Sequence, residues 1–253
     1  MPERKCVIVA VCGSSGAGKS TFALALGRAL ARRRKVVCIS PDPACPALSF
    51  WLPDQVPPHG MERSLGALLQ YSVIDLEAVA GCLIPDPHCP DLALMGMELG
   101  CYPGRYGEPD PSAVGIVLDM IRREVDYIVV DCVTDIPSDP LSRTAFTSAD
   151  CAVCLLTPDC KGLSWLEMAR AEGRDLSRVG TVFCPVLRES PLDELREKTG
   201  GTVINLPFSD EVALRICSGA PLTGFQKQAG RYYEKAVRSF AAALASGGGK
   251  KDG

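Results

Sequence analysis

The sequence predicts an α/β fold, a single domain in which helices flank a doubly wound, mostly parallel sheet of about seven strands. Three observations lead to this prediction. Short apolar runs alternate with helix-like segments along the whole chain. Most of these runs are continuously apolar, as expected when helices cover both faces of a parallel sheet. A glycine-rich loop separates the first predicted strand from the first predicted helix.

Seven apolar runs have the length of strands and are bounded by turn residues or helix-like segments. One of them ends in Asp131, and another is followed two residues later by Asp42; both residues are considered for the site below. In chain order the predicted strands are residues 6–12, 36–40, 92–95, 127–131, 151–157, 181–184 and 202–206.

Six segments have helix-like patterns. In the first, Phe22, Leu26 and Leu30 recur at helical spacing, and the basic run that follows suits a helix C-terminus. In the last, Tyr233 and Val237 lie on an Ala-rich face without a dense basic border, which favours packing against the sheet over membrane binding. The predicted helices are residues 19–34, 113–124, 163–174, 192–198, 210–218 and 225–244.

Other segments do not follow the alternation of strands and helices. The stretches 41–60 and 85–111 are rich in proline and too long for simple connections, so at least one of them is expected to be a functional loop. Residues 246–253 are mostly Gly and Lys and are expected to form a disordered tail. The domain is therefore predicted to occupy residues 1–245.

Composition limits the class of protein. The 253 residues carry a net charge of −3, with 47% hydrophobic and 23% charged residues. This balance excludes a disordered chain or a coiled coil and supplies no overall positive charge for nucleic acid or anionic lipid. No uncharged apolar run reaches the ~18 residues that span a bilayer. Thirteen cysteines without a signal peptide indicate a cytoplasmic location, where thiols pack as small apolar side chains.

The glycine-rich loop has the spacing of a phosphate-binding P-loop, G-x-x-x-x-G-K-[ST]. Its glycines let the backbone approach phosphates and direct N–H groups at them. Lys19 supplies charge for the β- and γ-phosphates and a catalytic contact, while Ser20 supplies a hydroxyl ligand for Mg²⁺. The predicted nucleotide contacts in the loop are Gly13, Ser14, Ser15, Gly16, Ala17, Gly18, Lys19, Ser20 and Thr21.

Two aspartates are candidates for the metal site. Asp131 ends the predicted strand 127–131, as does a Walker B carboxylate that holds Mg²⁺ through water. The alternative is an ordinary aspartate that caps the next turn. Asp42 follows the strand 36–40 and is expected at the same edge of the sheet, where it would orient the attacking water or join the Mg²⁺ shell. Its alternative role is that of a turn residue between Pro41 and Pro43.

The order of the segments resembles the ParA/MinD group of P-loop ATPases, a deviant Walker A class of the SIMIBI type. The resemblance implies binding of ATP and Mg²⁺, ATP hydrolysis of low intrinsic rate, a homodimer, and a role as a nucleotide-dependent positioning or assembly switch. It also implies base contacts from Cys184, Pro207 and Phe208. Beyond the P-loop, the matching segments are residues 38–43, 126–131, 131–137, 149–158 and 206–222.

The chain departs from this family at three positions. The family signature is K-G-G-x-G-K-[ST], whose first lysine reaches the phosphates of the partner subunit, and Ser14 stands there in this chain. Ser40 replaces the first aspartate of Asp-x-Asp, and Cys184 replaces an asparagine that often reads the base. Such departures resemble the TadZ/CpaE branch, which localises pilus machinery to the cell pole and commonly carries a receiver-like domain that has no counterpart in this sequence.

Two alternative functions remain open at this point. The missing lysine favours a TadZ-like scaffold that binds nucleotide and hydrolyses it weakly or not at all. The loop also resembles those of small-molecule kinases, which need an Arg-rich lid, and Arg63 and Arg105 are the evident candidates for it. The sequence identifies no protein partner, and its composition supports neither DNA nor membrane association. The family resemblance adds peripheral attachment to the inner face of the membrane as an alternative location.

Overall fold

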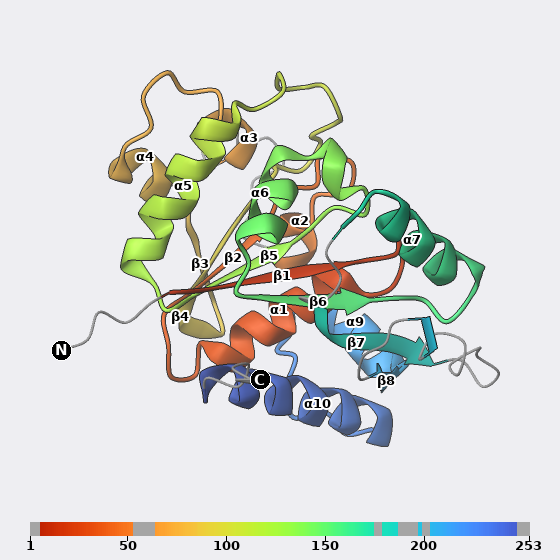
Figure 1. The fold of residues 1–253 in the computed structure, drawn as a ribbon. Coiled ribbons are helices and arrows are strands. Elements are labelled where there is room, and N and C mark those ends of the chain that lie inside the picture. The colour runs from red at the N-terminus through yellow and green to blue at the C-terminus, as the bar shows by residue number, and fades with distance from the viewer. Residues whose placement is uncertain (1–5, 53–63, 175–178, 187–196, 199–202, 247–253) are drawn as a thin grey trace.

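A twisted sheet with helices on both faces forms the centre of the molecule (Figure 1). The computed structural model describes residues 6–52, 64–174, 179–186, 197–198 and 203–246. In this part of the chain the sheet has eight strands in the order β3-β4-β2-β5-β1-β6-β7-β8. The strands are β1 (Val7–Gly13), β2 (Val36–Ser40), β3 (Ile84–Asp86), β4 (Cys89–Gly96), β5 (Tyr127–Asp131), β6 (Cys151–Leu155), β7 (Val179–Val186) and β8 (Val203–Pro207).

All neighbouring strands are parallel except β3 and β4, which form an antiparallel pair at one edge. The predicted doubly wound, mostly parallel sheet is therefore confirmed, and each predicted run overlaps an observed strand. Strand β3 was not predicted, because three residues that include a proline give too short a pattern. The run predicted to continue to residue 157 ends at Leu155.

The helices divide between the two faces of the sheet, each with its own apolar core. Figure 1 shows α5, α6 and α7 on one face and α1 and α10 on the other. The described helices are α1 (Lys19–Leu30), α2 (Leu48–Trp51), α3 (Leu65–Leu68), α4 (Leu76–Gly81), α5 (Pro111–Glu124), α6 (Pro140–Ser148), α7 (Cys160–Ala171), α9 (Asp210–Cys217) and α10 (Gln228–Ala245), with a 3₁₀ turn η2 (Ile136–Ser138).

Side-chain caps and turns explain why helix ends differ from those predicted. The helix predicted at 163–174 begins at Cys160, because Asp159 accepts hydrogen bonds from the backbone N–H groups of Lys161 and Gly162. The helix predicted at 19–34 ends at Leu30, so the arginines that follow lie in a turn. Helix α6 was not predicted, although Asp139 and Pro140 are a good N-cap and N1 pair.

Two predicted segments fall mainly on residues that the structure does not describe. The predicted helix 192–198 lies outside the described residues except for 197–198, and the predicted tail does so from residue 247 onward. The predicted packing of the C-terminal helix is confirmed. Tyr233, Val237 and Ala241 of α10 are buried, and the rings of Phe22 in α1 and Phe240 in α10 lie 6.1 Å apart.

The predicted role of the cysteines as packing residues is also confirmed for most of the strand positions. The twelve cysteines in the described part of the chain are free thiols. The buried ones include Cys6, Cys12, Cys38, Cys132 and Cys154, which lie in or beside the central strands. Burial raises the pKa of the Cys6 thiol to about 11, so it stays protonated and apolar near neutral pH.

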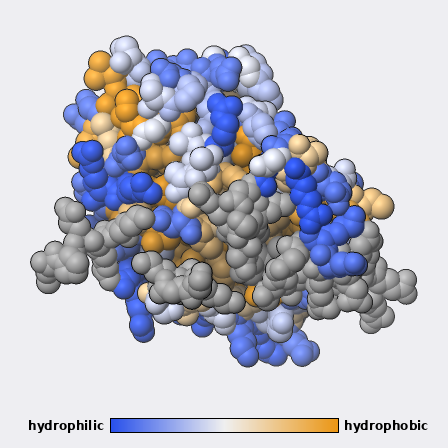
Figure 2. Space-filling model, viewed as in Figure 1, coloured by the Kyte–Doolittle hydropathy of each residue, from blue (hydrophilic) through white to orange (hydrophobic). Residues whose placement is uncertain are grey.

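The surface seen in Figure 2 is mostly a mixture of hydrophilic and hydrophobic residues. Hydrophobic residues gather at the upper left of this view, over α4 and α5 of Figure 1. The exposed large hydrophobic residues of these two helices are Leu76 of α4 and Ile116 of α5. Among the described residues, no helix combines the length and apolar character needed to cross a bilayer.

A buried ion pair fastens the antiparallel edge to the central helix. Arg28 of α1 donates from Nε and Nη2 to Oδ2 of Asp86 at 3.0 and 2.8 Å, and from Nη1 to the carbonyl oxygen of Ala220 at 3.1 Å. Both charged side chains are almost fully buried. One guanidinium therefore joins α1, the end of β3 and the loop before Pro221.

Replacing Arg28 with methionine is expected to lower the free energy of unfolding by about 3–5 kcal/mol, because it leaves the Asp86 carboxylate buried without its partner. Urea denaturation would measure the change. Arg32→Met, at an exposed position just beyond the same helix, is the control and should change stability by less than about 0.5 kcal/mol. An equal effect of the two substitutions would contradict a stabilising role for the buried contact.

Candidate functional site

The glycine-rich loop connects the end of β1 to the start of α1, as the sequence predicts. Gly13, Gly16 and Gly18 have φ values of +130°, +74° and +85°, which side chains rarely adopt. Gly13 also lies against β6: a Cβ atom there would be 1.8 Å from the carbonyl oxygen of Leu155. The glycines are thus required by both backbone conformation and close strand packing.

Gly13→Ala is expected to destabilise the protein by more than about 3 kcal/mol, because both β1 and β6 would have to shift. Gly16→Ala is the matched control. Its Cβ would meet no atom within 4 Å, so only the positive φ is unfavourable, by about 1–2 kcal/mol. Chemical denaturation of both variants separates the effect of the contact with Leu155 from that of the positive φ. Equal losses in the free energy of unfolding would show that the contact with Leu155 does not add to the destabilisation.

Ser14 points into the protein rather than out of the loop, and the residue is 2% exposed. Its N–H donates to the carbonyl oxygen of Leu155 at 3.0 Å, and its Oγ accepts from the N–H of Thr157 at 2.9 Å. Ser14 Oγ also lies 3.2 Å from Oγ1 of Thr157. The position that carries the family's signature lysine therefore ties the loop to the connection between β6 and α7.

Lys19 is the first residue of α1 and its ammonium group lies over the loop. Nζ donates to the carbonyl oxygen of Ser14 at 3.3 Å and to Oγ1 of Thr134 at 3.1 Å. Thr134 follows β5 in the segment that leads to α6. The amino group thus joins the loop to that segment, beside the start of a helix whose dipole favours anions.

Asp131 ends β5 and is 4% exposed. Its Oδ2 accepts from Oγ of Ser40 at 3.4 Å, while Oδ1 is buried without a hydrogen-bond partner. Burial raises the pKa of this carboxyl to about 6; the Ser20 hydroxyl and the Lys19 charge act in the opposite direction, and Asp42 adds to the rise. A buried carboxylate oxygen without a partner fits a ligand or a metal-bound water at this position.

Asp42 has the contacts of a turn residue and also lines a cavity with Lys19 and Asp131. Oδ1 accepts from the N–H groups of Ala44 and Cys45 at 2.9 and 3.1 Å, which is the geometry of a turn residue. The carboxylate also borders a cavity of about 300 Å³. The same cavity is lined by Ser15, Gly16, Gly18, Lys19, Ser20, Thr21, Cys45, Asp131, Cys132 and Thr134.

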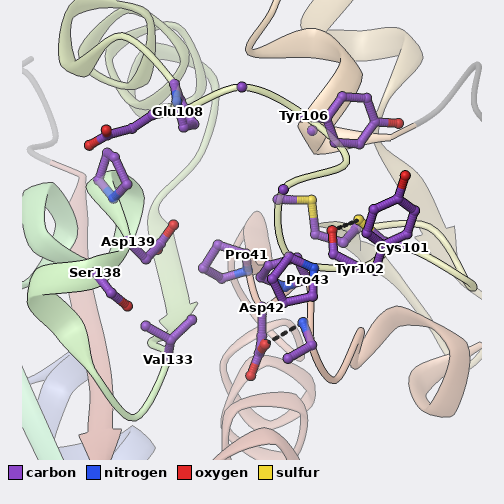
Figure 3. A pocket seen from close by; sticks show the side chains of 18 of the residues that line it. Pro41, Asp42, Pro43, Cys101, Tyr102, Tyr106, Glu108, Val133, Ser138 and Asp139 are labelled. Atoms are coloured by element: carbon purple, nitrogen blue, oxygen red, sulfur yellow. Dashed lines mark hydrogen bonds between the residues drawn. The ribbon is translucent and has the colours of Figure 1, made fainter.

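Asp42 also lines a larger cavity of about 520 Å³. Figure 3 shows Asp42 between the segment that carries Val133 and Asp139 and the loop that carries Tyr102 and Tyr106. Both proline-rich stretches therefore contribute to the edge of the sheet that holds the site. Of the two arginines considered for a kinase lid, Arg105 pairs with Glu98 at 3.0 Å, and Arg63 lies outside the described residues.

An apolar pocket of about 230 Å³ adjoins the loop and shares Gly16, Gly18 and Thr21 with the phosphate cavity. Pro207 and Phe208, two of the residues for which base contacts are predicted, line this pocket, and Phe208 is 60% exposed. Cys184 lies in β7 with its Cα opposite that of Asn205, but its side chain lies outside the described residues. The remaining lining is Gly16, Ala17, Gly18, Thr21, Leu155, Leu206, Ser209, Val212, Ala213, Ile216, Cys217 and Tyr233.

The contacts of two tryptophans with this region were not predicted from the sequence. The indole of Trp51 in α2 donates to the carbonyl oxygen of Ser20 at 3.1 Å, and the indole of Trp165 in α7 donates to that of Thr134 at 2.9 Å. Phe50-Trp51 stands out as an apolar pair in the first proline-rich stretch, but nothing in the sequence indicates its partner. Both tryptophans thus contact backbone of the site.

Comparison with known proteins agrees with this geometry. Residues 8–222 match the family described as the CobQ/CobB/MinD/ParA nucleotide binding domain. Septum site-determining protein MinD of Synechocystis is 25% identical over 183 residues, which span 70% of this chain and 63% of that protein, less than two thirds of its length.

The solved structures that share the fold include two MinD proteins. The MinD cell division protein of Aquifex aeolicus superposes with a TM-score of 0.71 at 18% identity, covering 93% of this chain and 97% of that one. MinD of Pyrococcus horikoshii, complexed with Mg-ADP, gives 0.72 at 17% identity over 96% and 99% of the two chains. Such identities establish the fold alone, whereas the match over residues 8–222 establishes the family. The chain belongs to the CobQ/CobB/MinD/ParA nucleotide-binding domain family.

Proposed function

We propose that this protein is a ParA/MinD-like ATPase that binds Mg·ATP and acts as a nucleotide-dependent positioning or assembly switch. The observation that supports it most strongly is the buried Oδ1 of Asp131, which has no partner and borders the same cavity as Lys19 and Ser20. A P-loop lysine, a hydroxyl and an acidic strand end are the groups that hold Mg²⁺ and the β- and γ-phosphates.

Each of these groups has a role in the proposed reaction. The loop N–H groups and Lys19 bind the phosphates, and Ser20 and Asp131 hold Mg²⁺, which would neutralise negative charge on the phosphate oxygens. Asp42 orients the attacking water through the carboxylate oxygen that the turn leaves free. The pocket beside Pro207 and Phe208 receives the base. The resemblance to ATPases favours adenine.

A scaffold with little or no hydrolysis is the second candidate, and the orientation of Ser14 favours it. The side chain is buried and bonded to Thr157, so it supplies no charge to a partner subunit. Within the described residues that line the phosphate cavity, Lys19 is the single cation. A homodimer assembled on ATP would therefore rely on contacts other than the signature lysine. The resemblance of the sequence to the TadZ/CpaE branch also favours this scaffold.

Nucleotide-dependent sizing combined with turnover tests both candidates. ATP, ADP and a non-hydrolysable ATP analogue are added with Mg²⁺, and binding, oligomeric state and phosphate release are measured. Binding with an ATP-dependent change in size supports the switch, and readily measurable intrinsic hydrolysis excludes the scaffold. Failure of all three nucleotides to bind would overturn the proposal. Product formation from a panel of metabolites would point to a kinase instead.

A further inference from the structure

The hydrogen bonds of Lys19 suggest how the site distinguishes nucleotides. An ammonium group has three N–H donors and no acceptor. Two of the three are engaged in this structure, by the carbonyl oxygen of Ser14 and the hydroxyl of Thr134. The third remains for a ligand. A phosphate group that needs one donor can bind without disturbing either contact, whereas one that needs two must displace a partner.

Of the two partners, Ser14 is the more firmly held. Its backbone N–H is bonded to Leu155 of β6, its Oγ is bonded to Thr157, and Gly13 before it packs against Leu155. Thr134 lies outside the regular elements, in the connection between β5 and η2, and its side chain is partly exposed. The Thr134 hydroxyl is therefore the partner that gives way.

We propose that Thr134 is a positioning residue through which the site distinguishes a nucleoside triphosphate from a diphosphate. The inference rests on the proposed function. With a diphosphate, Lys19 uses its third donor on the β-phosphate and keeps both existing contacts. With a triphosphate, it contacts the β- and γ-phosphates and releases Thr134, because only one donor remains for Ser14.

Loss of the hydrogen bond between Lys19 and Thr134 also affects α7, because the backbone of Thr134 contacts this helix. The carbonyl oxygen of Thr134 accepts from Nε1 of Trp165, which is buried in α7. The beginning of α7 is held to the loop by a second route, because Thr157 contacts Ser14 and donates from Oγ1 to Asp159, the N-cap of α7, at 2.6 Å. Helix α7 is thus held at its N-terminus by Asp159, and through Trp165 it contacts Thr134, whose hydroxyl loses its bond to Lys19 when a triphosphate binds.

Tryptophan emission tests this inference directly, because Trp165 contacts Thr134 and the second tryptophan, Trp51, can be removed as Trp51→Phe. In this background, Mg²⁺ with a non-hydrolysable ATP analogue is expected to change the emission of Trp165, and Mg·ADP is expected to leave it unchanged. Trp165→Phe with Trp51 retained measures the emission of Trp51 alone, which also contacts the site through Ser20. Subtracting this emission from that of the unaltered protein gives the Trp165 signal if Trp51→Phe folds poorly.

Thr134→Val removes the hydroxyl and keeps the shape of the side chain, while Thr134→Ser keeps the hydroxyl. Since Thr134 competes with the γ-phosphate for Lys19, Thr134→Val is expected to tighten binding of the analogue about threefold to tenfold, to leave ADP affinity unchanged, and to remove the difference in emission. Thr134→Ser is expected to behave as the unaltered protein. A merely structural role would not tighten binding of one nucleotide alone.

The failures of the two proposals are distinguishable. Equal emission changes with ADP and the analogue, or weaker binding of the analogue to Thr134→Val, would overturn the role given to Thr134 and leave nucleotide binding intact. Weaker binding would identify its hydroxyl as a direct ligand of the γ-phosphate. Absence of binding by the unaltered protein would instead overturn the proposed function.

Discussion

Lys19→Ala is expected to abolish detectable binding of Mg·ATP, with a loss in affinity of at least about 100-fold, and to weaken binding of Mg·ADP at least about tenfold. The ammonium group is the single cation among the described residues that line the phosphate cavity. Its two hydrogen bonds to the phosphates of ATP are together worth about 3–6 kcal/mol, and its single one to ADP about 1.5–3 kcal/mol. Calorimetric titration with Mg·ATP and Mg·ADP would measure the loss. Undiminished affinity in this variant would refute the assignment of the site.

Lys235→Ala is a charge-matched control for this experiment. Lys235 is exposed on α10 and does not line the phosphate cavity, so the substitution changes net charge equally without altering the site. Its affinity should match that of the unaltered protein. Because Lys19 also bonds Ser14 and Thr134, a comparison of urea denaturation curves separates lost contacts within the free protein from lost contacts with phosphate.

The sequence predicts best those features that depend on neighbours along the chain. The loop that begins at Gly13, and the strand and helix on either side, follow from local spacing and local conformational preference. The structure adds the reason for the first glycine, which is the close approach of Leu155 from a strand far along the sequence. The same holds for Asp131, whose place at a strand end is local but whose burial is not.

Contacts between distant segments account for what could not be predicted. Trp165 and Thr134, like Trp51 and Ser20, become partners only after the sheet orders its strands. No period or motif relates such residues. The inward orientation of Ser14 likewise depends on a distant segment. The sequence shows only that the family's lysine is missing at this position, and the structure shows that Ser14 instead contacts Thr157.

Asp131→Asn is expected to weaken binding of Mg·ATP and to raise the free energy of unfolding of the metal-free protein. Burial places the pKa of Asp131 at about 6, against an ordinary value of 3.8, so the ionised carboxylate is unfavourable in the folded state. Asparagine has the same shape and no charge. The free energy of unfolding near pH 7 should rise by about 1–3 kcal/mol, given ~1.4 kcal/mol for each pKa unit.

The pH dependence of this difference follows from the direction of the shift. Because the folded-state pKa is raised, the penalty of the ionised form is full above pH 6 and declines as the pH falls from 6 to 3.8, the ordinary pKa; the group is protonated in both states only at still lower pH. The stability of Asp131→Asn relative to the unaltered protein should therefore be largest above pH 6, become small near pH 4 and vanish below the ordinary pKa of 3.8. Urea denaturation at several pH values without Mg²⁺ measures it.

Magnesium binding should show the opposite dependence on pH. The metal needs the ionised carboxylate, so the affinity of the unaltered protein for Mg·ATP should fall up to about tenfold for each pH unit below 6, and that of Asp131→Asn should stay low and nearly constant. An equal decline in both proteins would assign the titration to another group. If both expectations hold, Asp131 is a group whose buried charge lowers the stability of the free protein and is retained because the bound metal requires it.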